Sequence, residues 1–399
     1  MKVLIVGGGS GGHIMPAIVV AEEILRQKPR ARLEFWTDKK CYKSVVKITT
    51  SRKVGGNLPI KIKRICSGKF RRYAGWKVVD YFKNFKITII DLIIKNIGGM
   101  FGFFVGTIQS FLRLIPKSKR PDVVFLKGGF VGLPVGIVAG WLKIPYVIHE
   151  SDSTAGLANR ILMKKAKKVT FGARLDENKE NWEWVGIPVR SDFRKVNETK
   201  QRSLKELFGF RMSEPLVVVT GGSQGAESIN QAMLTILPRL LKITSVGLIA
   251  GKKQYEQMVE LKKYEVWKDA KLKTNFRMWE FNSNMAELLG AADVVASRAG
   301  ATTIAELEVL GKAVILVPFE RLPGAHQVKN AEKLRDTGAV EMILDGEMRK
   351  KPELLYKVIK ELLEDKEKRR ELAEKLHEEA KASAAKRLAE IIIEVGGKA

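Results

Sequence analysis

Several residue types are scarce in this 399-residue chain, and each scarcity excludes a class of protein. The only two cysteines, Cys41 and Cys66, provide neither a disulfide framework nor the paired spacing of a zinc site, which fits a reducing cytoplasm. No signal peptide is expected, because Met1-Lys2 leads straight into a strand-like run. Low-complexity tracts are also lacking, so the composition is that of a folded globular protein long enough for two or three domains.

Acidic residues are nearly missing from residues 39–120, where 20 Lys or Arg accompany only Asp80 and Asp91. Such a block favours a polyanionic partner, either nucleic acid or an anionic membrane surface. The charges here are interleaved with aromatic residues and with many isoleucines and valines, whereas nucleic-acid binders seldom surround their aromatics with so much aliphatic sequence. A basic face combined with a large apolar face predicts attachment to a membrane surface, with nucleic-acid binding as the alternative.

A long uncharged run lies within this block, from Asn96 to Leu112. Its 17 residues are at the lower limit of what crosses a bilayer, and it contains four glycines. Basic residues flank it on both sides, so the charge distribution gives no orientation. We therefore expect a monotopic insertion or a glycine-rich hairpin in one leaflet rather than a true span.

Apolar runs alternate with helical patterns along the chain, which predicts a doubly wound α/β fold. Two of the runs lead into glycine clusters, at residues 7–13 and 221–230, which predicts two Rossmann-like domains facing a cleft. The first cluster contains GxGxxG, but its only acidic followers at the expected distance are Glu34 and Asp38, so a dinucleotide site is not supported. The predicted strands are Val3–Val6, Leu33–Trp36, Val123–Leu126, Tyr146–His149, Val169–Phe171, Leu216–Thr220, Val246–Ala250, Val294–Ala296 and Val314–Val317.

Four motifs rich in glycine and polar residues follow these runs, where parallel strands hand over to helices and ligands bind. In chain order they are GGGSGGH (7–13), the stretch from KGGF to HESDSTAGLANR (127–160), GGSQGAESIN (221–230), and SRAGATTIAELEVLGKAVILVPF with HQVKNA (297–331).

In this order the motifs resemble the MurG-type family of bacterial glycosyltransferases, which add N-acetylglucosamine from its UDP donor to undecaprenyl-pyrophosphoryl-muramyl-peptide. The resemblance runs from Lys2 to about Ile343, although residues 39–120 match only in character. It implies a GT-B fold with domains at 1–189 for the acceptor and the membrane and at 190–372 for the donor. The terminal helix, 373–399, would pack back on the first domain.

The resemblance implies that the donor is held mainly by backbone amides and small residues. Ala301, Thr302 and Thr303 would meet the α-phosphate at a helix N-terminus, and Glu306 would bind the ribose diol. The further donor contacts implied are Gly222, Ser223 and Gln224 for phosphate, Phe281 and Asn282 for uracil, and His326 and Gln327 for the sugar.

On the acceptor side, the family gives His13 the role of general base, for which an imidazole is suited near neutral pH. Glu150 follows a predicted strand and is either the base itself or the group that orients His13; the alternative is a carboxylate that holds a loop. Other residues expected to line the acceptor site or the cleft are Ser10, Gly11, Gly12, Gly128, Gly129, Asn159 and Arg190.

The sequence departs from the family pattern at three places. Residues 149–152 read HESD where the family has HEQN, residues 186–190 read GIPVR for GNPVR, and Ala299 replaces a serine. A transferase acting on diacylglycerol or another lipid is therefore the alternative function. An epimerase of the same fold would not need the basic and apolar block at 39–120.

The resemblance therefore implies an inverting hexosyltransferase of peptidoglycan synthesis, with a place in cell shape and division. It would lie at the cytoplasmic face of the membrane as a peripheral protein, and other cell-wall synthesis proteins are potential partners. No obligatory cofactor or metal is expected, because no DxD-type pair ends a strand in the donor half: Asp293 is isolated, and Asp345 lies beyond the motifs. Amides, helix N-termini and Arg298 would then meet the diphosphate charge.

Overall fold

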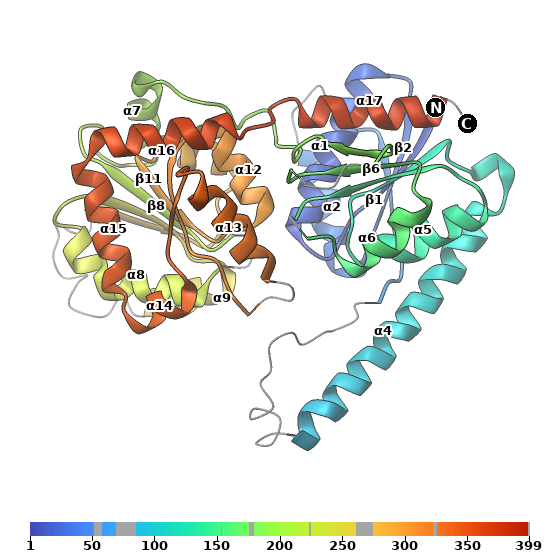
Figure 1. Ribbon diagram of the computed structural model, residues 1–399, viewed down its shortest axis with the longest axis horizontal. Helices are drawn as coiled ribbons and strands as arrows, with labels where there is room; N and C mark the ends of the chain where they lie inside the picture. The colour runs from blue at the N-terminus through green and yellow to red at the C-terminus, as the bar shows by residue number, and fades with distance from the viewer. Residues whose placement is uncertain are drawn as a thin grey trace. The chain divides into compact units, whose positions relative to one another are not determined.

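A computed structural model describes residues 1–51, 58–68, 85–152, 154–174, 179–222, 225–260, 274–321 and 325–397. The chain forms two compact units, which are coloured along the sequence in Figure 1. The N-terminal unit comprises Met1–Arg190 with Lys381–Ala399, and the C-terminal unit comprises Ser191–Ala380.

A seven-stranded parallel sheet forms the centre of the N-terminal unit, in the order β3-β2-β1-β4-β5-β6-β7. Its strands are buried on both faces at the centre of the sheet, as the continuous apolar runs predict. The strands are β1 (Lys2–Val6), β2 (Arg32–Thr37), β3 (Ile60–Arg64), β4 (Val123–Leu126), β5 (Tyr146–Glu150), β6 (Lys168–Phe171) and β7 (Trp182–Trp184).

Helices cover both faces of this sheet, which makes it a three-layer unit (Figure 1). One face packs on α1 (Gly11–Gln27), α2 (Lys39–Ser51) and α17 (Ala384–Gly397). The other face packs on α4 (Phe85–Leu114), α5 (Gly132–Trp141) and α6 (Leu157–Leu162). Two short 3-10 helices, Lys117–Lys119 and Met163–Lys165, complete the unit.

A single helix, α4, occupies the region where a glycine-rich hairpin was one expectation, so that expectation is wrong (Figure 1). Its glycines let another backbone approach closely: a β-carbon at Gly106 would lie 2.0 Å from the Cys66 carbonyl oxygen, and one at Gly102 2.9 Å from that of Ser67. The glycines therefore seat the segment after β3 against α4.

The C-terminal unit is built around a six-stranded parallel sheet with the order β10-β9-β8-β11-β12-β13. Its strands are β8 (Leu216–Thr220), β9 (Ser245–Ile249), β10 (Phe276–Trp279), β11 (Val294–Ser297), β12 (Ala313–Leu316) and β13 (Glu341–Met342). Its helices are α7 (Glu198–Leu207), α8 (Glu227–Leu240), α9 (Lys252–Glu260), α11 (Met285–Ala291), α12 (Ala301–Leu310), α13 (His326–Asp336), α14 (Asp345–Lys350), α15 (Glu353–Glu364) and α16 (Lys366–Glu378).

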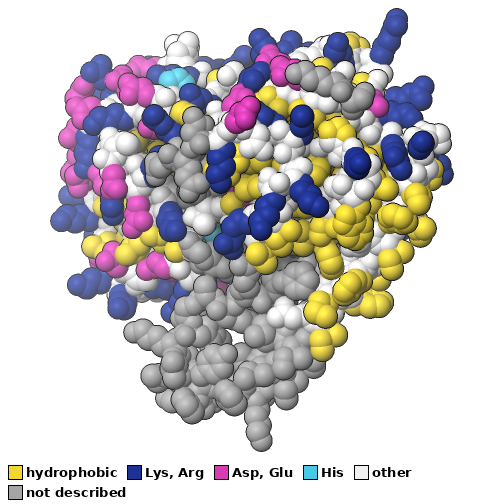
Figure 2. All heavy atoms as spheres, turned by 45° about the vertical axis from the view of Figure 1, so that its right-hand side comes forward, with side chains coloured by type: hydrophobic (Ala, Val, Ile, Leu, Met, Phe, Trp, Pro, Cys, Tyr) yellow, Lys and Arg dark blue, Asp and Glu magenta, His cyan; other side chains and the backbone are white. Residues whose placement is uncertain are grey.

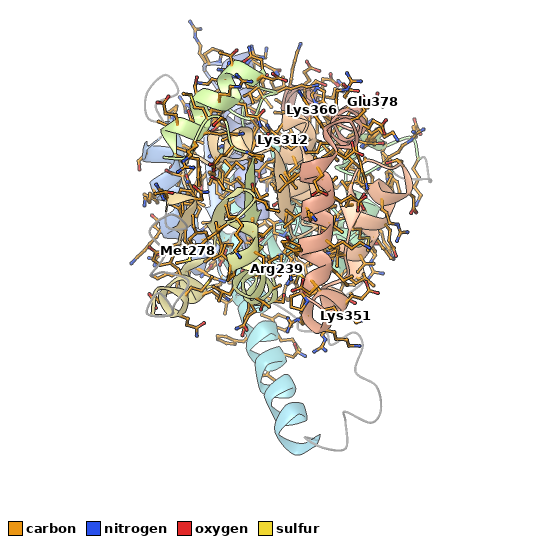
Figure 3. All side chains as sticks on the ribbon, turned by 90° about the vertical axis from the view of Figure 1, so that its left-hand side faces the viewer. Arg239, Met278, Lys312, Lys351, Lys366 and Glu378 are labelled. Atoms are coloured by element: carbon orange, nitrogen blue, oxygen red, sulfur yellow. The ribbon has the colours of Figure 1, made fainter. Side chains whose placement is uncertain are left out.

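Helices α8 and α15 lie side by side on this sheet, and Arg239 of α8 forms a 2.6 Å ion pair with Glu353 of α15. Figure 3 labels Arg239 at this contact, and it labels Lys366 and Glu378 at the two ends of α16.

The C-terminal unit ends later in the sequence than residue 372, where its boundary was expected. The sequence from 352 to 393 forms three helices, because Asp365 caps α16 by accepting from the backbone N–H of Lys368 and the chain turns again after Glu379. Leu372 and Leu376 of α16 are buried, and Nδ1 of His377 lies 2.9 Å from the Glu308 carbonyl oxygen. The C-terminal unit therefore extends to Ala380, and only α17 belongs to the N-terminal unit, where it packs against α1.

Candidate active site

The carboxyl ends of β1, β4 and β5 bring the expected acceptor residues of the N-terminal unit together. Ser10 begins the turn into α1, its carbonyl accepts from the amide of His13, and Gly11 and Gly12 form the first residues of the helix. Asp38, after β2, holds the loop by accepting from Gly9 N–H at 2.9 Å. Asp38 therefore has a structural role here, whereas in a dinucleotide site this carboxylate would bind a ribose.

The imidazole of His13 lies against the turn that follows β4. A β-carbon at Gly129 would lie 3.3 Å from Nε2 of His13, and both Gly128 and Gly129 have positive φ, which suits glycine. The pKa of His13 is lowered to about 4, mainly by burial and also by the nearby charge of Lys127, while Glu150 and the backbone of Lys127 act in the opposite direction. The ring is therefore neutral at physiological pH, as a general base must be.

Glu150 ends β5 and is buried, and it holds the loop that follows the strand. Its Oε1 accepts from the amide of Asp152 at 3.1 Å, and its Oε2 accepts from the amide of Gly156 at 3.0 Å and from Nδ2 of Asn159 at 2.8 Å. These three bonds favour the alternative that Glu150 is a carboxylate holding a loop. A β-carbon at Gly128 would lie 2.9 Å from Nδ2 of Asn159, so this network continues to the glycine turn.

Sequence reasoning missed one residue of this cluster, Lys127. It directly follows β4, is 1% exposed, and donates from Nζ to Oγ of Ser151 at 2.5 Å. Burial lowers the pKa of Lys127 to about 8, opposed by the charges of Glu150 and Asp152. The position of Lys127 in the sequence could have revealed it, because a charged residue here stands directly between a fully apolar strand and a glycine turn.

Arg190, also expected at the acceptor site or the cleft, does not directly follow β1, β4 or β5. It is the last residue of the N-terminal unit and ends the segment that begins at Gly186.

The second glycine loop follows β8 in the C-terminal unit. Gly222 and Gly225 have positive φ, and the amide of Gly225 donates to the Gly222 carbonyl at 3.0 Å shortly before α8 begins. Ser223 and Gln224, expected to meet the donor phosphate, lie outside the described residues.

Helix α12 begins where β11 ends, at the same edge of the sheet. Gly300 stands at its N-cap position, and Ala301, Thr302 and Thr303 form its first turn, where helical amides and the helix dipole favour an anion. Glu306 is half-buried and lies three and four residues after Thr303 and Thr302, hence on the same face of the helix. The structure therefore groups the four residues that were expected to contact phosphate and ribose.

The remaining donor residues are held by their own loops. Phe281 is 68% exposed, whereas Asn282 is buried and its Oδ1 accepts from the amide of Asn284 at 2.8 Å. His326 and Gln327 begin α13, and Oε1 of Gln327 accepts from the amide of Phe319 at 3.0 Å.

Arg298 is held by three groups of the C-terminal unit. Its guanidinium donates to Asp345 at 2.7 Å, to Oγ of Ser228 at 2.7 Å and to the Val317 carbonyl at 3.0 Å. The side chain is 12% exposed, and Asp345 is shared with Arg349, which it also meets at 2.7 Å. These bonds fix the guanidinium within the unit, and its contact with the donor diphosphate stays a prediction.

Unsatisfied polar atoms occur beside glycines at the strand ends. Among the described residues, six buried side-chain nitrogen or oxygen atoms have no hydrogen-bond partner, and buried polar groups are otherwise nearly always paired. Three of the six lie close to where a β-carbon would stand on a glycine of these loops: Oγ1 of Thr37 at Gly8, Oδ1 of Asn159 at Gly128 and Oε1 of Gln254 at Gly225. Ligands bind at such strand ends in open α/β sheets. The other three are Nδ1 of His13, Nε2 of His149 and Oδ1 of Asn230.

An exposed apolar stripe runs along α4, which we call the α4 stripe. Its members recur every three or four residues, so they share one helical face, and hydrophobic side chains gather in this region with Lys and Arg beside them (Figure 2). By length and composition alone, Asn96–Leu114 could cross a membrane, with a mean hydropathy of 1.3 and 22% of its window buried. The α4 stripe consists of Ile97, Met100, Phe101, Phe104, Ile108, Phe111, Leu112 and Ile115.

Phe103, another aromatic residue of the block at 39–120, does not belong to the α4 stripe. It is partly buried and packs against the hydrophobic core of the N-terminal unit. Two more aromatic residues of that block, Trp76 and Phe82, lie outside the described residues, as does the side chain of Phe85.

Two parallel sheets with glycine loops and helix N-termini at their strand ends define a GT-B glycosyltransferase. The chain belongs to glycosyltransferase family 28: residues 3–171 match the N-terminal domain of that family and residues 216–388 match its C-terminal domain. The predicted α/β class with two Rossmann-like domains is thereby confirmed.

Relatives with known names match over nearly the whole chain. A UDP-N-acetylglucosamine--N-acetylmuramyl-(pentapeptide) pyrophosphoryl-undecaprenol N-acetylglucosamine transferase of Thermoanaerobacter sp. (strain X514) is 32% identical over 396 residues, 98% of this chain and 99% of the relative. The same-named protein of Desulfitobacterium hafniense (strain Y51) is 32% identical over 391 residues, 94% of each chain.

Solved structures share the fold. MurG of Acinetobacter baumannii superposes with a TM-score of 0.68 at 22% identity, over 98% of this chain and 99% of that one. The calicheamicin glycosyltransferase CalG4 gives a TM-score of 0.64 at 13% identity, over 100% of this chain and 98% of that one.

Proposed function

We propose that this protein transfers N-acetylglucosamine from UDP-N-acetylglucosamine to the muramyl sugar of undecaprenyl-pyrophosphoryl-muramyl-peptide, with inversion at the anomeric carbon. The observation that carries the proposal is the neutral, half-buried His13 against the Gly128-Gly129 turn, in a chain whose 32% identical relatives bear that activity in their names. The glycine loops at both sets of strand ends support two ligands, one on each unit.

In the proposed mechanism His13 removes the proton of the acceptor hydroxyl as its oxygen attacks the anomeric carbon. The new glycosidic bond forms while the bond from that carbon to the UDP oxygen breaks. The first turn of α12 stabilises the negative charge that develops on the leaving diphosphate, and Glu306 holds the ribose. Glu150, which accepts three hydrogen bonds, keeps the loop and Asn159 in place beside His13.

The direct test is transfer of radiolabelled N-acetylglucosamine from its UDP donor to a panel of lipids. We expect label in the undecaprenyl-pyrophosphoryl-muramyl-peptide and none in diacylglycerol. Label in diacylglycerol alone would replace the proposed acceptor, and label in neither would refute the transfer. His13→Ala serves as the inactive control.

No obligatory metal is part of this proposal. Among the described residues no cluster of three or more histidine, cysteine or acidic side chains could hold an ion, and the Asp345 carboxylate is paired with Arg298 and Arg349 at 2.7 Å. We expect activity to survive EDTA. Complete loss in EDTA that a divalent ion restores would contradict the proposal.

The α4 stripe is proposed to hold the enzyme peripherally on the cytoplasmic face of the membrane, where a polyprenyl-linked acceptor is found. Its eight apolar side chains are exposed, and basic residues of the same unit lie near them: Arg113 on the helix stacks on Trp36 at 5.2 Å and donates to the Arg64 carbonyl. Apolar insertion and attraction of cations to anionic lipid would act together.

Vesicle binding separates these two contributions. High salt should weaken binding to anionic vesicles without abolishing it, and replacement of Phe101, Phe104 and Ile108 by serine should leave only a salt-reversible remainder. The matched control is Leu207→Ser, an equally exposed side chain in the other unit. Equal binding to neutral and anionic vesicles would contradict the electrostatic part, and unchanged binding of the serine variant would contradict insertion.

A further inference from the structure

A buried ammonium group lies beside His13, although the transfer chemistry itself assigns it no role. Lys127 is 1% exposed, and its Nζ donates to Oγ of Ser151 at 2.5 Å. Lysine is almost never fully buried without a partner or a task, because removing its charge from water is costly. A hydroxyl partner alone does not neutralise that charge.

The fold brings the chain segments of Lys127 and His13 together. Lys127 is the residue after β4, and the turn it begins is the one against which the His13 ring packs, with Gly129 leaving room for Nε2. The charged groups that act on His13 come from two strand ends: Lys127 after β4 and Glu150 on β5. Lys127 and His13 in turn lower the pKa of the buried His149 on β5. Glu150 and Asp152 act in turn on Lys127.

A like charge in a dry site disfavours protonation of its neighbour. The ammonium of Lys127 therefore opposes a proton on His13, and the Glu150 carboxylate offsets part of that effect. Ser151 fixes where the ammonium lies, because its hydroxyl belongs to the same loop that Glu150 holds. The cluster thus sets the charge on His13 by geometry.

We propose, on the basis of the function proposed above, that Lys127 is a positioning residue for His13. Its ammonium, anchored on Ser151, opposes a proton on the imidazole, so that His13 can still take the acceptor proton at mildly acidic pH. Lys127 does not touch the reacting atoms in this role. The residue acts through the protonation state of His13.

Proton NMR of the imidazole groups tests this directly, because the chain has only four histidines. The His13 signal is assigned with His13→Gln and followed against pH in the wild type and in Lys127→Met. We expect the pKa of His13 to rise from about 4 by about one to two units in Lys127→Met, the usual size of shift when a nearby like charge is removed. The signals of His326 and His377, in the other unit, should keep their chemical shifts and so report that the fold is intact.

The pH profile of transfer provides the functional measurement. The acidic limb of kcat/KM should move up by the same amount in Lys127→Met, and Lys127→Arg should restore it. Ser151→Ala keeps the charge and should leave the limb within a few tenths of a unit. A His13 titration that stays unchanged in Lys127→Met would overturn the proposal, as would a raised acceptor KM with an unmoved limb, which would make Lys127 an acceptor ligand.

The two proposals fail separately. A shifted His13 titration without transfer to any acceptor would refute the proposed function while leaving the effect of Lys127 on His13 intact. Normal transfer with an unshifted titration would refute only the role of Lys127.

Discussion

Glu150→Gln distinguishes a carboxylate that holds a loop from a catalytic base. The Glu150 carboxylate has three donors: the amides of Asp152 and Gly156, and Nδ2 of Asn159. A glutamine can place its single carbonyl oxygen where Oε2 stands and keep the two bonds made there. Its NH₂ group then faces the Asp152 amide, and two donors oppose each other.

The cost follows from the bonds that change. One hydrogen bond to a charged acceptor is lost, which is worth about 1.5–3 kcal/mol, and the two that remain become weaker neutral bonds. The loop between β5 and α6 should open more often by the corresponding factor, about tenfold to a hundredfold. The loss of stability should be local to the N-terminal unit, because all three donors belong to it.

Hydrogen exchange of the Asp152 and Gly156 amides measures this opening, and transfer activity is measured in the same preparations. We expect exchange to accelerate by about tenfold to a hundredfold and activity to fall with it. Glu183→Gln is the matched control, since that carboxylate is bonded by the side chains of Arg387 and Lys168 rather than by loop amides. Unchanged exchange together with a loss of activity would refute the loop-holding role and make Glu150 the base.

Three further outcomes are expected. His13→Ala should lower kcat by about 10²–10⁴ while UDP affinity measured by calorimetry stays the same; a collapse of UDP affinity would show that His13 is not the base. Glu306→Ala should weaken donor binding by about 1.5–3 kcal/mol, seen as a higher KM for the UDP-sugar, and an unchanged KM would remove Glu306 from the donor site. Because the folded-state pKa of His13 is about 4 rather than 6.5, the unfolded chain binds a proton on it first as the pH falls. The N-terminal unit should therefore lose up to about 3 kcal/mol of stability from this histidine between pH 6.5 and pH 4. The free energy of unfolding, measured with urea at several pH values in this range, should fall less steeply with decreasing pH in His13→Gln than in the wild type. An equal dependence on pH would contradict the depressed pKa.

The central strands of both sheets were predictable from the sequence, whereas the edge strands were not. The four strands missed are β3, β7, β10 and β13, and each one lies at the edge of its sheet. An edge strand is partly exposed, so its sequence is not a continuous apolar run: β3 reads IKIKR and β7 reads WEW. Pattern recognition that relies on two-sided burial therefore finds only the interior of a sheet.

The grouping of candidate site residues was likewise predictable where it depended on strand ends. Residues that follow parallel neighbouring strands must meet at one edge, which places His13, Gly129 and Glu150 together. What the sequence could not give was the state of each charge. Lys127 is buried with its ammonium on Ser151, and Arg298 is paired with Asp345 from α14, which it shares with Arg349. Such partners are set by tertiary packing and leave no local pattern.

The packing of α17 on the N-terminal unit has a consequence for how the chain folds during synthesis. The hydrophobic core under α1 includes Leu388, Ile391 and Ile392 of α17. This core therefore stays incomplete until residues 384–397 have left the ribosome. The C-terminal unit, by contrast, has all of its own elements by Ala380 and can close first. The usual order, in which the earlier domain finishes folding first, is thereby reversed. A premature stop after residue 380 would leave the later unit whole and damage the earlier one.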